Sequence, residues 1–341
     1  MQRELNKYDI LKAGAILLVV IGHITRLYRS EVHPEINTKY FELITRSIYT
    51  FHMPLFMALS GVLYGLKKES YVSNVKSFLI NKVNRLLIPY ITGAIVLTAV
   101  LVYIGEVSLQ PGGEISSILY NIFCFQNIKH LWFILALFQI FVIQILCDRL
   151  NIPILISLTI SLVTGIIYKT YFTGYAEFAC THMALQYWPY FIIGNIIIQY
   201  PINSIKKIYA YSCFIPILIY FRHIAQSSAL RAVAEYTIAI LIILLIVYIL
   251  DYVDISKISN KFKLATASIA DTSFAIYLFH VPALFLFHDY FTENSVSLLI
   301  AVPMLFILSI IVPIIIIKLF RTLGLSTLLG EKHGHYTKIT V

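Results

Sequence analysis

The twenty residues Leu298–Ile317 read LLIAVPMLFILSIIVPIIII, and they decide the fold class because none of them carries a charge. An apolar run of this length can cross the roughly 30 Å hydrocarbon core of a bilayer as a helix. Tyr236–Leu250 is a second such run, YTIAILIILLIVYIL. In lipid, only helices or closed barrels satisfy the backbone N–H and C=O groups. Barrel strands alternate apolar and polar residues. These runs do not alternate, so we expect an all-α protein.

The composition of the whole chain agrees with this reading. Of the 341 residues, 59% are hydrophobic and 13% are charged, against about 25% charged in a typical soluble domain. So few charges cannot cover a soluble surface, so lipid must cover much of the protein. We see no soluble domain, no repeat of fixed period and no low-complexity linker. The sequence therefore predicts a polytopic integral membrane helix bundle.

Ten segments are apolar and long enough to be candidate spans, although the fifth and seventh are short. We place them near residues 8–28, 42–66, 84–105, 130–148, 152–169, 183–200, 207–222, 230–250, 270–288 and 295–319. The 106–129 connection contains Pro111-Gly112-Gly113 and is long enough for a lid or a re-entrant piece. We expect residues 1–325 to form one transmembrane domain and residues 326–341 a short cytoplasmic tail.

The positive charges predict the orientation. Ten spans put both termini on one side of the membrane, and that side then holds 18 of the 26 lysine and arginine residues. Such an excess marks the cytoplasmic side, so we expect both termini in the cytoplasm. The net charge of +9 is then explained by topology and by contact with anionic membrane lipids. Nothing in the pattern supports binding to nucleic acid.

The first apolar run, Ile10–Ile24, predicts a membrane span and no cleaved signal peptide, because no small-residue cleavage site follows it. The four cysteines are widely spaced and show no CxxC pattern. The cysteine spacing therefore says little about redox state or metal, and we predict no metal cofactor.

Ionisable residues inside a span are costly and usually face a cavity or a partner. At 100° per residue, Asp9, Lys12 and His23 share one stripe of the first span. The helix rise puts His23 roughly 16 Å beyond Lys12, toward the outer half of the membrane. Asp9 and Lys12 are equally explained by an i,i+3 pair at the interface with Lys12 extended toward water. His23 lies too deep for that, which favours a functional role.

The second predicted span contains Phe51-His52-Met53-Pro54 and ends with Ser60-Gly61. Pro54 has no N–H to donate to the carbonyl of Thr50 and should kink the helix beside His52. Ser60 and Gly61 allow close helix packing. His52 is therefore either a functional group near mid-membrane or a hydrogen-bonded residue at a structural kink.

The remaining polar candidates lie in three other spans. Arg85 opens the third span on the predicted cytoplasmic side, where it either binds a phosphate or only fixes orientation. His130 and Trp132 open the fourth span, and an interfacial tryptophan is usual. In the ninth span one helix face carries a hydroxyl, a phenol and an imidazole, which form either a polar cavity or a satisfied packing network: Ser273, Tyr277 and His280.

Together these segments resemble acyltransferase family 3, integral-membrane enzymes that O-acylate sugars and cell-envelope polymers. The resemblance covers nearly the whole chain, which implies that the transmembrane domain of residues 1–325 is an acyltransferase domain. The Phe51–Gly61 segment is similar to the branch that includes sugar O-acetylases of the fucose-acetylase type. Many members carry Arg where this chain has Lys12, and many have an appended hydrolase-like domain, which we do not expect here. The motifs follow in the family's order: Asp9, Lys12 and His23; Phe51-His52-Met53-Pro54-Leu55-Phe56; Arg85-Leu86-Leu87-Ile88-Pro89-Tyr90; His130-Leu131-Trp132-Phe133; Phe191-Ile192-Ile193-Gly194; Ser273–His280.

The resemblance implies a multi-pass protein of a bacterial plasma membrane that moves an acetyl or similar acyl group from acyl-CoA to a sugar or polysaccharide hydroxyl. Such transfer needs a base for the hydroxyl proton, and an imidazole titrates near neutrality. We expect His23 to be the base or a transient acyl carrier, with His52 and His280 orienting it or the acceptor. Lys12 and Arg85, with Asp9, are the expected donor-binding residues. Ser273, Tyr277, His130 and Trp132 are the expected substrate or cavity residues.

Two other classes of protein fit parts of the pattern. A transporter or flippase of a lipid-linked sugar also needs many spans, midplane histidines and a kinked helix, although we see no inverted repeat. A structural membrane subunit would not need aligned ionisable groups. Acyl-CoA hydrolysis or transfer by the purified protein separates the three.

Overall fold

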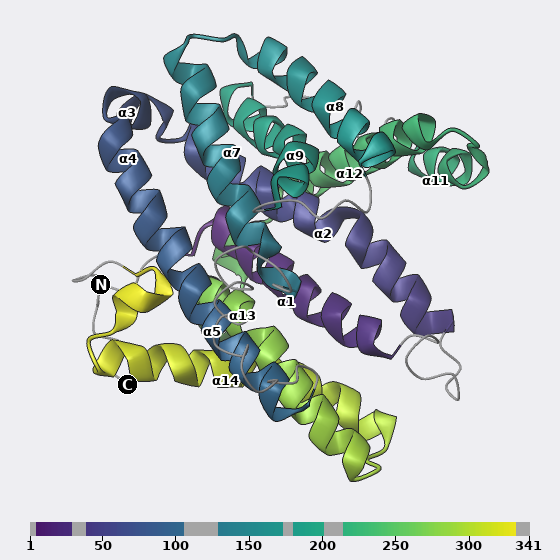
Figure 1. The fold of residues 1–341 in the computed structure, drawn as a ribbon, viewed down its shortest axis with the longest axis vertical. Coiled ribbons are helices and arrows are strands. Elements are labelled where there is room, and N and C mark those ends of the chain that lie inside the picture. Colours follow the sequence, from purple (N-terminus) through teal and green to yellow (C-terminus); the bar gives the residue numbers. More distant parts are fainter. Residues whose placement is uncertain (1–4, 29–38, 106–128, 173–179, 201–213, 332–341) are drawn as a thin grey trace, which may run out of the picture. The chain divides into compact units, whose positions relative to one another are not determined.

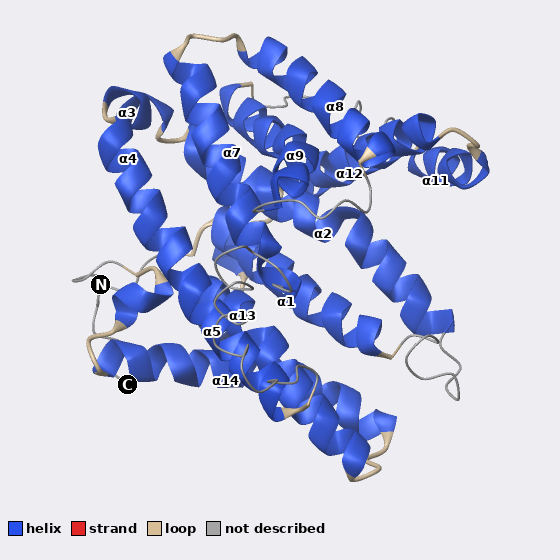
Figure 2. Cartoon of the chain, viewed as in Figure 1, coloured by secondary structure: helices blue, strands red, loops and turns tan. Residues whose placement is uncertain are grey.

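The computed structural model describes residues 5–28, 39–105, 129–172, 180–200 and 214–331. Across these ranges the chain forms helices joined by turns, with no strand (Figures 1 and 2). The long helices are α1 (Lys7–Leu27), α2 (Lys39–Gly65), α5 (Ile88–Tyr103), α7 (Trp132–Arg149), α8 (Ile154–Tyr171), α9 (Thr181–Gln199), α11 (Ile215–Ile224), α12 (Ser228–Asp251), α13 (Asn260–Glu293) and α14 (Leu298–Thr322). The short elements are α3 (Lys68–Ser73), α4 (Val75–Lys82), the π-helix η1 (Val83–Leu87), and the 3₁₀ turns η2 (Lys129–Leu131), η4 (Ile255–Lys257) and η5 (Ser326–Leu329).

Eight helices of the described chain are long and apolar enough to cross a membrane. The expectation of an all-α, multi-pass membrane protein is confirmed. α9 and the ten-residue α11 are helical but fall outside those eight, so the count of ten and the orientation stay predictions. The Pro111-Gly112-Gly113 connection, the start of the seventh predicted span and the last ten residues lie outside the described residues.

Two helices extend well beyond the apolar segments from which they were predicted. The third span continues backward without a break through η1 and α4 to Val75. α13 begins at Asn260, where the Ser259 hydroxyl accepts the Phe262 N–H at 3.4 Å and caps the first turn. A hydropathy pattern marks only the part of a helix that lipid covers, whereas polar helix-forming residues continue the same helix into water.

The described chain divides into two compact units, of which unit 1 comprises residues 1–45, 80–135 and 259–341. α13 is the central helix of unit 1 and packs against α1, α5 and α14. Ten consecutive residues of α13, Ala275–Leu284, are buried. A helix buried on every side is the natural place for polar groups that must avoid lipid.

Unit 2 comprises residues 46–79 and 136–258. Within it α2 and α9 meet through small residues. A Cβ at Gly61 would overlap the Phe191 carbonyl, and one at Gly194 would overlap the Ala58 carbonyl. The expectation that Gly61 allows close packing is confirmed, whereas the Ser60 hydroxyl bonds the Phe56 carbonyl of its own helix at 2.9 Å. Backbone contact of this kind holds membrane helices together by van der Waals attraction.

Candidate active site

Unit 1 brings three histidines together from distant parts of the sequence. His23 comes from α1, His280 from the centre of α13 and His130 from η2. The ring centroids of His23 and His280 lie 5.1 Å apart, those of His130 and His280 5.0 Å, and those of His23 and His130 6.3 Å. We call these three residues the histidine cluster. His280 and His130 are 0% and 4% exposed, whereas His23 is only half-buried.

Backbone carbonyls fix the protonation of His280. Its Nδ1 lies 2.8 Å from the Ile276 carbonyl and 2.9 Å from the Tyr277 carbonyl, both in its own helix. A carbonyl only accepts, so Nδ1 carries the hydrogen and Nε2 keeps the lone pair. That Nε2 is buried without a hydrogen-bond partner among the described residues.

His130 is fixed in the opposite tautomer by a carbonyl that a proline makes available. Pro282 has no N–H, so the carbonyl of Leu278, four residues earlier, lacks its usual helical donor. The His130 Nε2 lies 3.3 Å from this carbonyl and donates to it. The lone pair is then on Nδ1, which is also buried without a partner in the part of the chain that the structure describes.

Two neighbouring lone pairs therefore lie next to His23 with nothing described to bond them. A buried polar atom left unpaired costs about 1–3 kcal/mol, so native proteins keep such atoms mainly where water or a ligand completes them. The described residues contain no group of three or more His, Cys, Asp or Glu side chains arranged to hold a metal ion. The arrangement suits proton transfer to or from a bound molecule.

Aromatic side chains close the cluster around His130. The Tyr277 hydroxyl donates to the His130 carbonyl, and the Tyr277 ring lies 5.5 Å from the His130 ring and 5.4 Å from that of Phe133. Trp132, the first residue of α7, stacks edge-on against Phe133 with centroids 6.2 Å apart. The structure thus places Tyr277 against His130 of the cluster, whereas Trp132 contacts Phe133.

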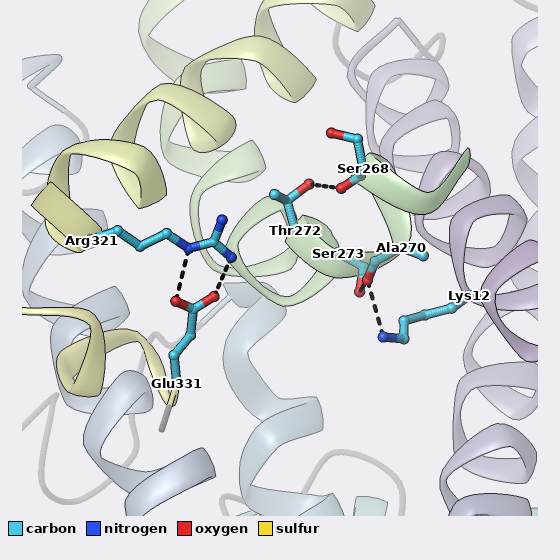
Figure 3. Close-up of polar contacts among 7 residues, drawn as sticks. All are labelled: Lys12, Ser268, Ala270, Thr272, Ser273, Arg321 and Glu331. Atoms are coloured by element: carbon cyan, nitrogen blue, oxygen red, sulfur yellow. Dashed lines mark hydrogen bonds and ion pairs between the residues drawn. The ribbon is translucent and has the colours of Figure 1, made fainter. Parts of the chain in front are cut away.

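Lys12, Asp9 and Ser273 lie at the other end of the α1–α13 contact. The Lys12 ammonium donates to the Ala270 carbonyl at 3.0 Å, and the Ser273 hydroxyl donates to the same carbonyl at 2.9 Å (Figure 3). Asp9 is buried and forms a capping box with Asn6, whose N–H lies 3.2 Å from the Asp9 carboxylate. Asp9 therefore has a structural role in starting α1, and its part in donor binding stays a prediction.

Arg85 is exposed and lies in the π-helix η1, just before Pro89. Pro89 cannot donate to the Arg85 carbonyl, and Gly330 packs there instead. At φ +76°, Gly330 is in the left-handed region, and a Cβ on it would lie 2.7 Å from the Arg85 carbonyl oxygen. The Arg321 guanidinium fixes this contact by binding Glu331 through Nε at 2.9 Å and Nη2 at 2.5 Å (Figure 3). We call the Arg321–Glu331 pair the C-terminal clamp.

His52 belongs to unit 2. It is 2% exposed, its Nδ1 lies 2.8 Å from the Ile48 carbonyl, and its ring lies 4.7 Å from that of Tyr49. These contacts are those expected of a hydrogen-bonded histidine with a structural role, and a functional role for His52 stays a prediction. α2 continues through the neighbouring Pro54 as one helix.

Tyr28 and His288 were not singled out from the sequence, although they continue the seam between α1 and α13. Their ring centroids lie 5.4 Å apart. His288 follows His280 by eight residues, about 80° around the helix after two turns, so the two lie on one broad helix face. That spacing is the signal that could have found it.

The fold and the site define a membrane protein with a largely buried histidine cluster in unit 1, and with Lys12 at the other end of the contact between α1 and α13. A family model described as an acyltransferase domain, that of acyltransferase family 3, matches residues 5–318. The chain therefore belongs to this family, and its helices are those of a multi-pass membrane protein. A segment of 60 residues is 47% identical to the nodulation protein NolL of Sinorhizobium fredii (strain NBRC 101917 / NGR234) and spans 16% of this chain and 14% of that protein. No solved structure matches the chain.

Proposed function

We propose that the protein transfers an acetyl or similar acyl group from acyl-CoA to a hydroxyl of a sugar or cell-envelope polysaccharide. The single observation that carries this proposal is the histidine cluster, with two lone pairs fixed by backbone hydrogen bonds beside a half-buried third imidazole. The family match gives acyl transfer as the class of reaction. The histidines supply the proton transfer that an alcohol acceptor requires.

His23 is our candidate for the general base. A base must be reached by the substrate, and His23 is the only member of the cluster that is not fully buried. As the acceptor oxygen attacks the thioester carbon, the imidazole takes the hydroxyl proton. The C–S bond then breaks, the ester C–O bond remains, and the imidazolium gives its proton to the departing thiolate, directly or through water. The lone pair of His280 can accept a hydrogen bond from an N–H of His23 or from a water beside it. His280 would then position the His23 imidazole.

The distance between Lys12 and His23 along α1 suits the length of an acyl-CoA donor. Lys12 lies eleven residues before His23, roughly 16 Å along the helix. Coenzyme A has a long arm between its phosphates and its thioester, so phosphates held near Lys12 and Arg85 leave the acyl group free to reach deeper. Positive groups at a helix end suit phosphate, and an arginine can bind it through two hydrogen bonds.

Substitution of His23 tests the proposal. With purified protein in detergent, His23→Ala should lower acyl transfer by the roughly 10²–10⁴-fold that a lost general base costs. His23→Gln keeps a hydrogen-bonding group but cannot take a proton near neutral pH, so it should be nearly as inactive while still binding acyl-CoA. Both rates are measured as release of free coenzyme A with and without a sugar acceptor.

The glutamine variant also decides against the proposal. Substantial activity in His23→Gln would move the base to His280 or His52. Absence of any acyl-CoA turnover in well-folded wild-type protein, together with movement of a lipid-linked sugar in vesicles, would favour the flippase.

A further inference from the structure

Unit 2 contains a second polar cavity that the proposed chemistry does not use. Five helices line it: α2, α8, α9, α11 and α12. Its volume is about 220 Å³, below the roughly 300–1,000 Å³ that drug-sized ligands occupy. One ring of the size of a monosaccharide fits it, and a folded cofactor does not.

Charged residues meet at this cavity from separate helices. Glu235 of α12 binds Lys169 of α8 and also Arg222 of α11, whose Nε lies 2.9 Å from the carboxylate. Arg46 of α2 also lines the cavity. Of the described lining residues, three are cations and one is an anion, so the wall is positive. Arginine and lysine in a partly buried wall favour a carboxylate or phosphate.

Tyrosines form much of the rest of the wall. Tyr190 and Tyr236 are 4% and 3% exposed, and their ring centroids lie 5.3 Å apart. The Tyr236 hydroxyl donates to the Gln186 carbonyl at 2.8 Å, and Gly165 makes room because a Cβ there would overlap that hydroxyl. Tyr49 and Tyr187 also line the cavity. Aromatic rings offer an apolar face and a polar edge, which match the C–H face and the hydroxyls of a sugar.

We infer that this cavity binds one residue of a saccharide that carries a negative charge, as a uronic acid or as a sugar phosphate. The cations hold the anionic group, the tyrosines hold the ring, and Glu235 keeps Lys169 and Arg222 in place while the cavity is empty. The inference rests on the proposed function in one respect, because we take the bound saccharide to be the acyl acceptor. In the predicted orientation the ends of the helices that carry these charges face away from the cytoplasm.

Binding to the purified full-length protein tests the inference directly. The probes are the methyl glycoside of glucuronate, methyl glucoside, glucose 1-phosphate and inorganic phosphate, with dissociation constants from titration calorimetry at low salt. We expect the better of the two anionic sugars to bind at least about ten-fold more tightly than methyl glucoside, and that sugar identifies the anionic group. Equal binding of the neutral sugar overturns the inference, and so does binding of inorganic phosphate as tight as that of glucose 1-phosphate.

Three variants separate ligand binding from a purely structural ion cluster. Arg222→Gln should weaken the anionic sugar about ten-fold or more, as expected for a lost charge-assisted hydrogen bond. Glu235→Gln should strengthen it, because the competing carboxylate is gone. Arg231→Gln, an exposed arginine of α12 outside the cavity lining, is the matched control and should change nothing. A structural cluster predicts weaker binding and a lower melting temperature for both Arg222→Gln and Glu235→Gln, which overturns the inference.

The two proposals can fail separately. Acyl-CoA hydrolysis that depends on His23, without binding of any anionic sugar, removes the cavity assignment and leaves the proposed function. Binding of an anionic sugar by a protein that turns over no acyl-CoA removes the proposed function and leaves the cavity as a saccharide site.

Discussion

Single residues that lack a hydrogen-bond donor shape the polar sites of this protein. Pro282 frees the Leu278 carbonyl, which fixes the tautomer of His130. Pro89 likewise cannot donate to the Arg85 carbonyl four residues earlier, and Gly330 packs on that carbonyl. In a bilayer a freed carbonyl must be satisfied by protein or bound water, so each proline creates an acceptor at a defined place.

Replacing Pro282 tests this role without removing any side chain that touches substrate. Pro282→Ala restores an N–H that competes with His130 for the Leu278 carbonyl. We expect kcat to fall roughly 2- to 10-fold, the equivalent of one ordinary hydrogen bond, while the melting temperature stays equal or rises because an interior proline is costly in a helix. Pro303→Ala in α14, at an exposed proline, is the control. An unchanged kcat would show that the Pro282 effect on His130 does not reach the chemistry.

The sequence indicated individual site residues better than it indicated their partners. Helical spacing predicted that Lys12 shares a helix face with His23, and Tyr277 with His280, because residues on one helix are related by a fixed angle. It could not bring His130 to His280, since that contact joins residues 150 apart and depends on how α13 packs. The unit 2 cavity was not predicted for the same reason, because Glu235, Lys169 and Arg222 come from three separate helices.

At the scale of helices, close backbone contact between α2 and α9 should be sensitive to one methyl group. Gly61→Ala places a Cβ where the Phe191 carbonyl lies, and overpacking of this kind costs about 1–3 kcal/mol. Gly14→Ala in α1 is the matched control, because a Cβ there meets nothing within 4 Å and alanine is about 0.5–1 kcal/mol better in a helix. Thermal unfolding in detergent should show a lower midpoint for Gly61→Ala and an equal or higher one for Gly14→Ala. Equal midpoints for wild type and Gly61→Ala would mean that the helices separate at little cost.

The C-terminal clamp should act on donor binding through η1. Arg85→Ala should raise the KM for acyl-CoA by roughly 10- to 150-fold, the equivalent of 1.5–3 kcal/mol, and should change kcat less. Glu331→Gln should raise the KM only about two- to five-fold, because an ion pair whose side chains are 26% and 24% exposed contributes up to about 1 kcal/mol. Lys257→Gln, at an exposed lysine, should leave KM unchanged. A wild-type KM in folded Arg85→Ala would leave Arg85 with only a topological role.

For the molecule as a whole, the charge distribution predicts the orientation. A reporter fused after Val341 should be cytoplasmic, and one inserted in the 106–128 connection should be extracytoplasmic, because 18 of the 26 basic residues then lie inside. Protease protection in sealed vesicles reads both positions. Reporters on the same side would contradict the ten-span prediction.

Hydropathy predicted the helices of the described chain, but their ends and the two-unit division depend on contacts that composition does not reveal.

The division of unit 1 into three separate stretches of chain has a consequence for biosynthesis. α1 leaves the ribosome before its partner α13, which begins roughly 230 residues later, a delay on the order of 10–50 s at common rates of translation. Unit 2 is made during that interval, and His23 has no contact with His280 until α13 follows. A nascent chain released before α13 would lack His280, so on the roles proposed for the histidine cluster we expect it to be inserted in the membrane but catalytically inert until α13 has been made.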